Sequence, residues 1–205
     1  MRKNRNYHHK YQYIAGVDEA GRGPLAGPLV VAAVILGKCK IPGLDDSKKL
    51  SPAKRELLFE KIKNRAKCWH IEVVSVSDID RLNILQATML GMTNSVHNLQ
   101  IKPDFCLIDG NKVPQELTKF AKAIVKGDSK YAEISAASIL AKVYRDRLMQ
   151  DIHQQYPQYN FASNKGYPTR EHKEALQKFG ITNWHRKSFK PVNQIDFNYL
   201  LNRND

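Results

Sequence analysis

YIAGVDEAGRGPLAGPLVVAAVIL, residues 13–36, holds two apolar runs on either side of a loop rich in glycine and proline. The first run, YIAGVD, is typical of a short strand, and the second, LVVAAVIL, is typical of a buried strand. Two strands joined across such a loop predict that the ordered part of the chain begins with a β-hairpin.

Helix and strand signals alternate after this hairpin. Ser51 is a favourable N-cap and Pro52 a favourable first helical residue, which predicts a helix over residues 52–66. Residues 68–77, CWHIEVVSVS, are rich in β-branched side chains and predict a strand. Residues 78–96 then predict one or two helical segments.

Two short apolar runs end on a carboxylate beside a glycine, DFCLIDG (104–110) and AKAIVKGD (121–128), as buried strands do at a sheet edge. Residues 131–156 have apolar and small side chains at helical spacing, which predicts the main central helix, and 169–179 predict a short helix. Strands that alternate with helices favour an α/β fold. We therefore expect a central mixed β-sheet flanked by helices, with a helical C-terminal part over about 150–205.

Length and composition fit one globular domain. The chain has 205 residues, 42% of them hydrophobic, and we expect a flexible basic arm over residues 1–12 and a single domain over 13–205. No apolar run approaches the roughly 20 residues that span a bilayer, and no secretion segment follows the basic N-terminus. We expect no membrane partner and a cytoplasmic location. Cys39, Cys68 and Cys106 form no CxxC pair, which favours reduced thiols over a zinc site.

The net charge points to a polyanionic partner. Lys and Arg number 33 against 20 Asp and Glu, a balance of +13, which excludes the small acidic regulators. Neutralising phosphates releases condensed counterions, so a basic protein gains affinity for nucleic acid of any sequence. Solubility alone would account for the same charge.

Four acids follow the predicted strands: Asp18, Glu19, Asp109 and Asp128. Carboxylates that converge on one point are most readily stabilised by hard divalent cations, and a set of oxygen ligands favours Mg²⁺ or Mn²⁺ over zinc. Two such ions about 3.5–4 Å apart can orient a phosphodiester and stabilise the leaving oxygen of its hydrolysis. Each acid taken singly is equally typical of a turn or a helix cap.

Adjacent residues of a regular strand face opposite sides, so Asp18 and Glu19 can share a site only where the strand breaks. Residues 20–24, AGRGP, supply that break. Glycines there also let backbone amides approach a phosphate or a sugar hydroxyl. An ordinary hairpin turn would have the same glycines.

Five collinear blocks carry a family resemblance: VDEAGRGPLAGPLVVAAVIL, LDDSKKLS, LIDGNK, KGDSKYAEISAASILAKVYRDRLM and NKGYPTREH. In order and spacing they resemble bacterial ribonuclease HII, of the ribonuclease H-like superfamily, over residues 13–175. The resemblance implies a ribonuclease H-like fold, a monomer, and dependence on Mg²⁺ or Mn²⁺. It also implies cleavage of the RNA strand of RNA–DNA hybrids and incision 5′ to ribonucleotides in duplex DNA. Such cleavage leaves a 3′-hydroxyl and a 5′-phosphate and serves ribonucleotide and primer removal.

The resemblance also assigns roles to matching residues. Asp18, Glu19, Asp109 and Asp128 correspond to the four metal-binding, catalytic acids. The tripeptide Gly21-Arg22-Gly23 corresponds to the element that senses the ribose 2′-hydroxyl, and Tyr167 to the tyrosine that stacks on the following deoxyribose.

Other polar residues remain open to two interpretations. Four basic residues are candidates for phosphate contacts, with solvent exposure as the alternative: Lys48, Lys49, Lys142 and Arg145. Ser135 and Ser138 are expected to pack or bond within a helix rather than act as nucleophiles. His172, near Tyr167, is a candidate for protonating the leaving group. In the tail, the charge of Arg186, Lys187 and Lys190 favours contact with substrate.

Three further hypotheses are considered. Ribonuclease HIII carries an additional N-terminal domain, for which we expect the 12 residues before Tyr13 to leave no room. A non-catalytic hybrid binder would gain affinity by losing the four acids, which are present. Gln194-Ile195-Asp196-Phe197 resembles short peptides that dock on sliding clamps, although a chance match in a polar tail gives the same letters.

Overall fold

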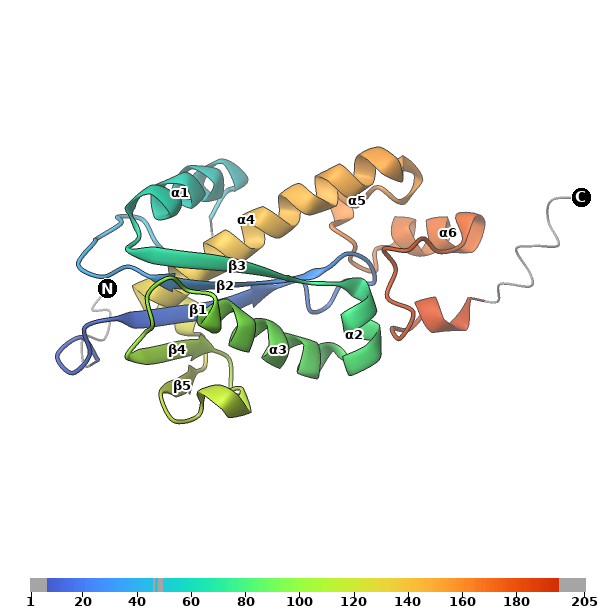
Figure 1. Cartoon of the computed structure of the whole chain (residues 1–205). Coiled ribbons are helices and arrows are strands. Elements are labelled where there is room, and N and C mark those ends of the chain that lie inside the picture. Colours follow the sequence, from blue (N-terminus) through green and yellow to red (C-terminus); the bar gives the residue numbers. More distant parts are fainter. Residues whose placement is uncertain (1–6, 46, 48–49, 196–205) are drawn as a thin grey trace, which may run out of the picture.

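A five-stranded mixed sheet lies at the centre of the protein (Figure 1). The structure, a computed structural model, describes residues 7–45, 47 and 50–195. The strand order is β3-β2-β1-β4-β5; β1 pairs antiparallel with β2 and parallel with β4. This confirms the expected hairpin and mixed sheet. The strands are β1 (Ile14–Ala20), β2 (Leu29–Ile35), β3 (Cys68–Val74), β4 (Phe105–Asp109) and β5 (Ala121–Ile124).

Helices cover both faces of this sheet (Figure 1). One face carries α1 (Pro52–Arg65) and α4 (Ala132–Gln155), and the other carries α3 (Ile84–His97). Along β2, alternate residues belong to the two cores: Val30 packs with the α1 and α4 side chains, and Val31 with those of α3. Burial on both faces explains why LVVAAVIL has no polar alternation.

One glycine allows α4 to approach the sheet closely. A Cβ added to Gly16 of β1 would lie 2.1 Å from the carbonyl carbon of Glu133 and 2.2 Å from the amide nitrogen of Ile134. Since these are backbone atoms at the start of α4, no side-chain rotation could make room. Helix α4, which lines the candidate active site, is therefore in backbone contact with β1.

Element boundaries follow local signals. The Ser51 hydroxyl accepts a hydrogen bond from the Lys54 amide at 3.3 Å, which confirms the expected N-cap of α1. The region 78–96 divides into α2 (Val76–Leu82) and α3, because Asn83 has a φ of 69° and its side chain accepts from the first amides of α3.

Asp128 differs from its expected place at a strand end. Strand β5 ends at Ile124, and Lys126 then adopts a left-handed conformation with a φ of 55°. Asp128 lies in the short 3₁₀ helix η3 (Gly127–Ser129) that follows. The tight turn at Lys126, which the apolar run AKAIV does not signal, causes the difference.

Two aromatic residues of the predicted N-terminal arm contact the domain. The rings of Tyr7 and Tyr11 stack on Phe105, with centroids 5.3 and 4.7 Å away. His8 Nε2 lies 3.3 Å from a carboxylate oxygen of Glu133 on α4. Aromatic contacts that join distant parts of the chain leave no periodic signal in a polar segment.

The helical C-terminal part surrounds a separate apolar cluster that includes Leu25, Met149, Tyr159 and Phe161. Its elements after α4 are η4 (Pro157–Tyr159), α5 (Phe161–Asn164), α6 (Arg170–Phe179) and η5 (Val192–Gln194). A further short 3₁₀ helix, η2 (Gln115–Leu117), precedes β5. Among the residues described, no helix is long and apolar enough to cross a bilayer. All three cysteines are free, as expected.

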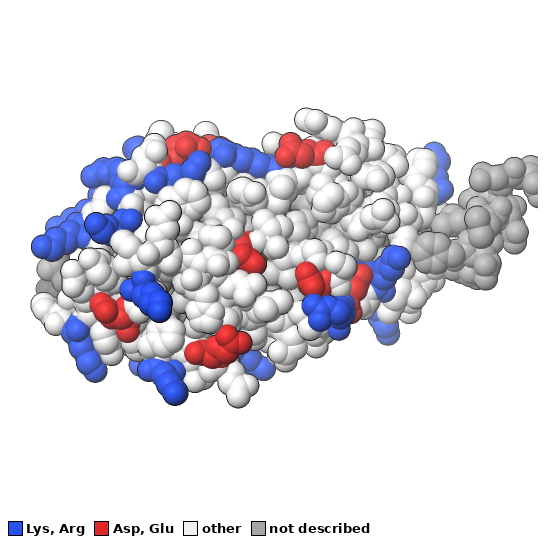
Figure 2. Space-filling model, in the orientation of Figure 1, with Lys and Arg blue, Asp and Glu red and all other residues white. Residues whose placement is uncertain are grey.

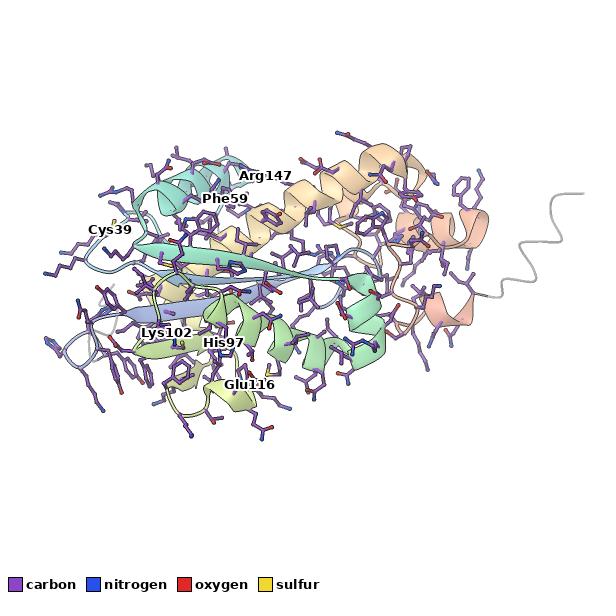
Figure 3. All side chains as sticks on the ribbon, in the orientation of Figure 1. Cys39, Phe59, His97, Lys102, Glu116 and Arg147 are labelled. Carbon is purple, nitrogen blue, oxygen red and sulfur yellow. The ribbon has the colours of Figure 1, made fainter. Side chains whose placement is uncertain are left out.

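Helices α1 and α4 are also joined at the surface. The guanidinium of Arg147 on α4 stacks over the ring of Phe59 on α1, 4.4 Å from its centroid (Figure 3). The same guanidinium pairs with Glu56 and Glu60. Exposed ion pairs of this kind stabilise proteins little, so the buried contact at Gly16 is the larger constraint on α4.

We expect Gly16→Ala to lower the free energy of unfolding by about 1–3 kcal/mol or more, because the added methyl overlaps the α4 backbone. Urea denaturation followed by circular dichroism measures the loss. Val73→Thr, at an exposed position of β3, is the matched control and should change stability by less than about 0.5 kcal/mol. Equal stability of the two variants would contradict the close contact.

Candidate active site

The four predicted acids line one cavity of about 440 Å³. Asp18 comes from β1 and Asp109 from the end of β4. Val17 pairs with Ile108 in these parallel strands, so the residues that come next, Asp18 and Asp109, lie on neighbouring strands at the same level. Asp128 comes from η3, which is anchored where the Gly127 amide donates to the Asp109 carboxylate at 2.6 Å. Three segments far apart in the sequence thus contribute carboxylates to one place.

The expected break in β1 lies slightly further along the chain than predicted. Ala20 is still paired with Val30 in the sheet, and the left-handed turn begins at Gly21, with a φ of 103°. Asp18 and Glu19 nevertheless both line the cavity. Two adjacent acids of a paired strand therefore line one cavity without a break in the strand between them.

Burial and the charge of neighbouring acids raise the pKa of Asp18 and of Glu19. Asp18 is 6% exposed, and its pKa is well above the ordinary aspartate value, first through desolvation and then through the charges of Glu19 and Asp109. The Ser138 hydroxyl and the Glu19 amide, the latter at 2.8 Å, bond the Asp18 carboxylate and oppose this rise. Desolvation also raises the pKa of Glu19, against the effect of Arg22, whose guanidinium lies 3.4 Å away.

One carboxylate oxygen in this group has no partner. Oε2 of Glu19 is buried and accepts no hydrogen bond from the described residues. A buried carboxylate oxygen without a donor is costly, and a cation would satisfy it. The donor set, which consists of carboxylates only, suits a hard divalent ion. Within the described ranges no three acid, histidine or cysteine side chains form a ready ligand set.

The loop between β1 and β2 forms another wall. Gly21, Arg22 and Gly23 line the cavity together with Lys142, and Tyr167 lines it from the C-terminal part. The Tyr167 side chain is 45% exposed, and a Cβ on Gly23 would lie 3.4 Å from its ring. The carboxylates and the predicted substrate-contacting residues therefore face one space.

Arg145 requires a correction. It was expected to contact phosphate, but it is 1% exposed, and its guanidinium donates to the carbonyls of Ala26, Pro28 and Lys165 at 3.0–3.1 Å. Burial lowers its pKa to about 10. Because the donors are used by the backbone, Arg145 supports the loop from beneath, although it borders the cavity.

Arg186 also differs from its prediction. The basic tail suggested contact with substrate, yet Arg186 is fully buried and donates to the carbonyls of Gly21, Arg22 and Gly27. Sequence analysis missed this supporting role. No pattern near residue 186 signals it, since the acceptors lie about 160 residues earlier in the chain.

His172 does not face the cavity. It is fully buried, its Nδ1 lies 2.9 Å from the Tyr167 carbonyl oxygen, and its Nε2 lies 3.1 Å from Nε2 of His185. Burial lowers the pKa of both histidines, to about 3 for His185. The hypothesis that His172 protonates a leaving group is therefore wrong for this arrangement. It supports the backbone that carries Tyr167.

The remaining candidates fall into two groups. Lys142 borders the cavity, with Nζ 2.6 Å from Asp146, while Lys48 and Lys49 lie outside the described residues. Ser135 donates to the Asp45 carbonyl at 2.8 Å, and the Ser138 hydroxyl lies 2.9 Å from that of Ser47. On the face shown in Figure 2, Lys and Arg side chains lie mostly toward the outline of the molecule, and Asp and Glu side chains lie among them.

Comparison with known proteins assigns the chain to a family. The sequence model of the Ribonuclease HII family matches residues 15–192. The chain belongs to the ribonuclease HII family. Ribonuclease HII of Aliivibrio fischeri (strain MJ11) is 55% identical over 190 residues, which cover 92% of this chain and 91% of that protein. Family membership makes the protein a ribonuclease H-type hydrolase that acts on nucleic acid.

Solved structures of the same fold agree. The crystal structure of ribonuclease H2 from Pyrococcus horikoshii OT3 is 28% identical, with a TM-score of 0.79, and the match covers 92% of this chain and 99% of that one. Ribonuclease HII in a complex with PCNA from Archaeoglobus fulgidus is 28% identical, with a TM-score of 0.73, over 91% and 99% of the two chains. The ribonuclease H-like fold with a helical C-terminal part is thereby confirmed.

We expect Asp18→Asn to abolish cleavage and to stabilise the metal-free protein by on the order of 1 kcal/mol at pH 8, because it removes a buried charge beside two others. The pKa of Asp18 is higher in the folded state than in the unfolded state. The wild type therefore loses stability as the pH rises through the raised pKa of Asp18. The advantage of the variant should therefore shrink toward pH 4. Urea denaturation in EDTA at both pH values measures it, and a less stable variant at pH 8 would contradict the repulsion.

Proposed function

We propose that the protein is an endonuclease that hydrolyses the RNA strand of RNA–DNA hybrids and incises duplex DNA on the 5′ side of embedded ribonucleotides. The products would be a 3′-hydroxyl and a 5′-phosphate. The observation that carries the proposal is the single cavity that four carboxylates share with Gly21-Arg22-Gly23 and Tyr167. The carboxylates that would bind metal and the groups that would contact a sugar therefore line the same cavity.

Asp18, Glu19, Asp109 and Asp128 would hold two Mg²⁺ or Mn²⁺ ions. Held by these residues, divalent ions would supply a lowered pKa for the attacking water and positive charge near the phosphate and the leaving oxygen. The carboxylates that the chain brings together repel one another, and bound cations would offset this repulsion. The Glu19 oxygen that has no donor among the described residues supports a cation at this place. The Gly127 and Ser129 amides hold the Asp109 and Asp128 carboxylates in place.

The loop and Tyr167 would recognise the substrate. Backbone amides of Arg22 and Gly23 are suited to donate to a ribose 2′-hydroxyl, a group that DNA lacks. The half-exposed ring of Tyr167 offers a surface on which the following deoxyribose can stack. Lys142 would contact a phosphate in place of its present partner, Asp146. Lys48 and Lys49 remain predicted phosphate contacts.

The proposed setting is the removal of misincorporated ribonucleotides and RNA primers by a monomer in the cytoplasm. Contact with a sliding clamp through residues 194–197 is part of this proposal, supported by the PCNA complex of the archaeal relative. Gln194 ends η5, Ile195 packs against the C-terminal apolar cluster, and Asp196 and Phe197 lie outside the described residues.

A defined duplex tests the activity. We expect wild-type protein with Mg²⁺ or Mn²⁺ to incise an end-labelled DNA duplex 5′ to its single ribonucleotide and to leave an all-DNA duplex intact. Asp109→Asn should reduce the rate at least about 10³-fold, since it removes one ligand charge from the centre. EDTA should abolish cleavage. Binding without incision under either metal would overturn the proposal in favour of a hybrid-binding protein.

Deletion of residues 196–205 tests the clamp contact. We expect the truncated protein to cleave a short free duplex at the wild-type rate and to bind the bacterial sliding clamp at least about tenfold more weakly, because the aromatic end of the peptide anchors such docking. Surface plasmon resonance on immobilised clamp measures the affinity. Unchanged affinity would end the hypothesis.

A further inference from the structure

The buried guanidinium of Arg186 binds three carbonyls of the loop between β1 and β2. Its Nη1 donates to Arg22 at 3.1 Å, its Nη2 donates to Gly21 at 2.6 Å and to Gly27 at 2.8 Å, and its Nε donates to Gly27 at 3.0 Å. Burial, together with the charge of nearby Arg145, lowers its pKa to about 9. An arginine buried in this way is costly unless its donors are used, and here the loop backbone uses them.

These contacts determine where the loop amides point. In a planar trans peptide, the carbonyl of one residue and the amide of the next point in opposite directions. Arg186 holds the Gly21 and Arg22 carbonyls from inside the protein, so the amides of Arg22 and Gly23 are directed away from it. These two amides donate to no acceptor among the described residues, while Gly21, Arg22 and Gly23 line the cavity.

The segment that carries Arg186 is itself fixed on both sides. The Gly27 amide donates to the Trp184 carbonyl and the Arg186 amide to the Leu25 carbonyl, both at 2.8 Å. On the other side, the Asp80 carboxylate of α2 accepts hydrogen bonds from the Lys187 and Ser188 amides, both at 2.9 Å. Helix α2, the C-terminal segment and the loop therefore form one connected unit.

We propose that Arg186 is a positioning residue that presents the Arg22 and Gly23 amides to the ribose 2′-hydroxyl and thereby sets the preference for a ribonucleotide over a deoxyribonucleotide. The inference rests on the proposed function, in which those amides contact the sugar. Arg186 does not touch substrate in this role. It acts through the two peptide groups whose carbonyls it holds.

Arg186→Lys separates positioning from charge. Lysine keeps the positive charge but has one nitrogen on a flexible stem, which cannot reproduce the planar fork that reaches three carbonyls. Arg147→Lys is the matched control. Arg147 is also an arginine, but it pairs with Glu56 and Glu60 and stacks on Phe59, away from the loop. Thermal denaturation checks that each variant is folded.

The decisive measurement is binding of two duplexes, in Mg²⁺, by full-length protein that also carries Asp109→Asn to prevent cleavage. The fluorescent duplexes differ only in one 2′-hydroxyl, and anisotropy gives both dissociation constants. We expect Arg186→Lys to reduce the preference for the ribonucleotide duplex about tenfold, the value of one hydrogen bond, with the all-DNA affinity unchanged. Arg147→Lys should leave the preference intact.

The outcomes distinguish the two levels of proposal. If the Asp109→Asn protein itself shows no preference for the ribonucleotide, sugar recognition in the proposed function is wrong and this inference fails with it. If the preference exists and folded Arg186→Lys retains it, or loses both affinities equally, the positioning role alone is overturned. Should Arg186→Lys fail to fold, Asp80→Ala, which releases the Lys187 and Ser188 amides, should reduce the preference by a smaller factor; an unchanged preference there overturns the inference.

Discussion

The carboxylates of Asp18, Glu19 and Asp109 repel one another where they meet at one cavity, and the rest of the structure has to hold them there. Burial and neighbouring charge raise the pKa of Asp18 and Glu19, so a metal-free protein carries this repulsion as a loss of stability near neutral pH. Hydrogen bonds to the carboxylates from the Glu19 and Gly127 amides and from Ser138 offset part of it.

The scaffold meets this constraint with parallel strands and a close helix contact. Strands β1 and β4 are adjacent and parallel, so the acids at or near their carboxyl ends come together without a long connecting loop at the site. Gly16 lets the backbone of α4 rest directly on β1, which brings Ser138 and Lys142 of that helix to the same cavity. The packed apolar faces of the sheet and helix thus keep the polar residues of the site in place.

The walls of the cavity are held from beneath by buried side chains of Arg145, Arg186 and His172. Arg145 and Arg186 donate to carbonyls of the loop between β1 and β2, and His172 lies against the carbonyl of Tyr167. Each of these side chains uses its donors on backbone oxygens. A fixed carbonyl fixes the direction of the next amide, so interior hydrogen bonds decide which groups the surface presents.

Local signals in the sequence determined the hairpin, the mixed α/β pattern, the Ser51 cap and the identity of the acids, because apolar periodicity and capping depend on residues only a few positions apart. The family resemblance added the proposed roles of Gly21-Arg22-Gly23 and Tyr167. Tertiary structure alone decided that Tyr7 and Tyr11 pack on Phe105, that Arg145 and Arg186 support a loop, and that His172 is paired with His185. A charged or aromatic letter is the same whether its side chain meets solvent, substrate or a distant carbonyl, and only the folded chain brings that partner within hydrogen-bond distance.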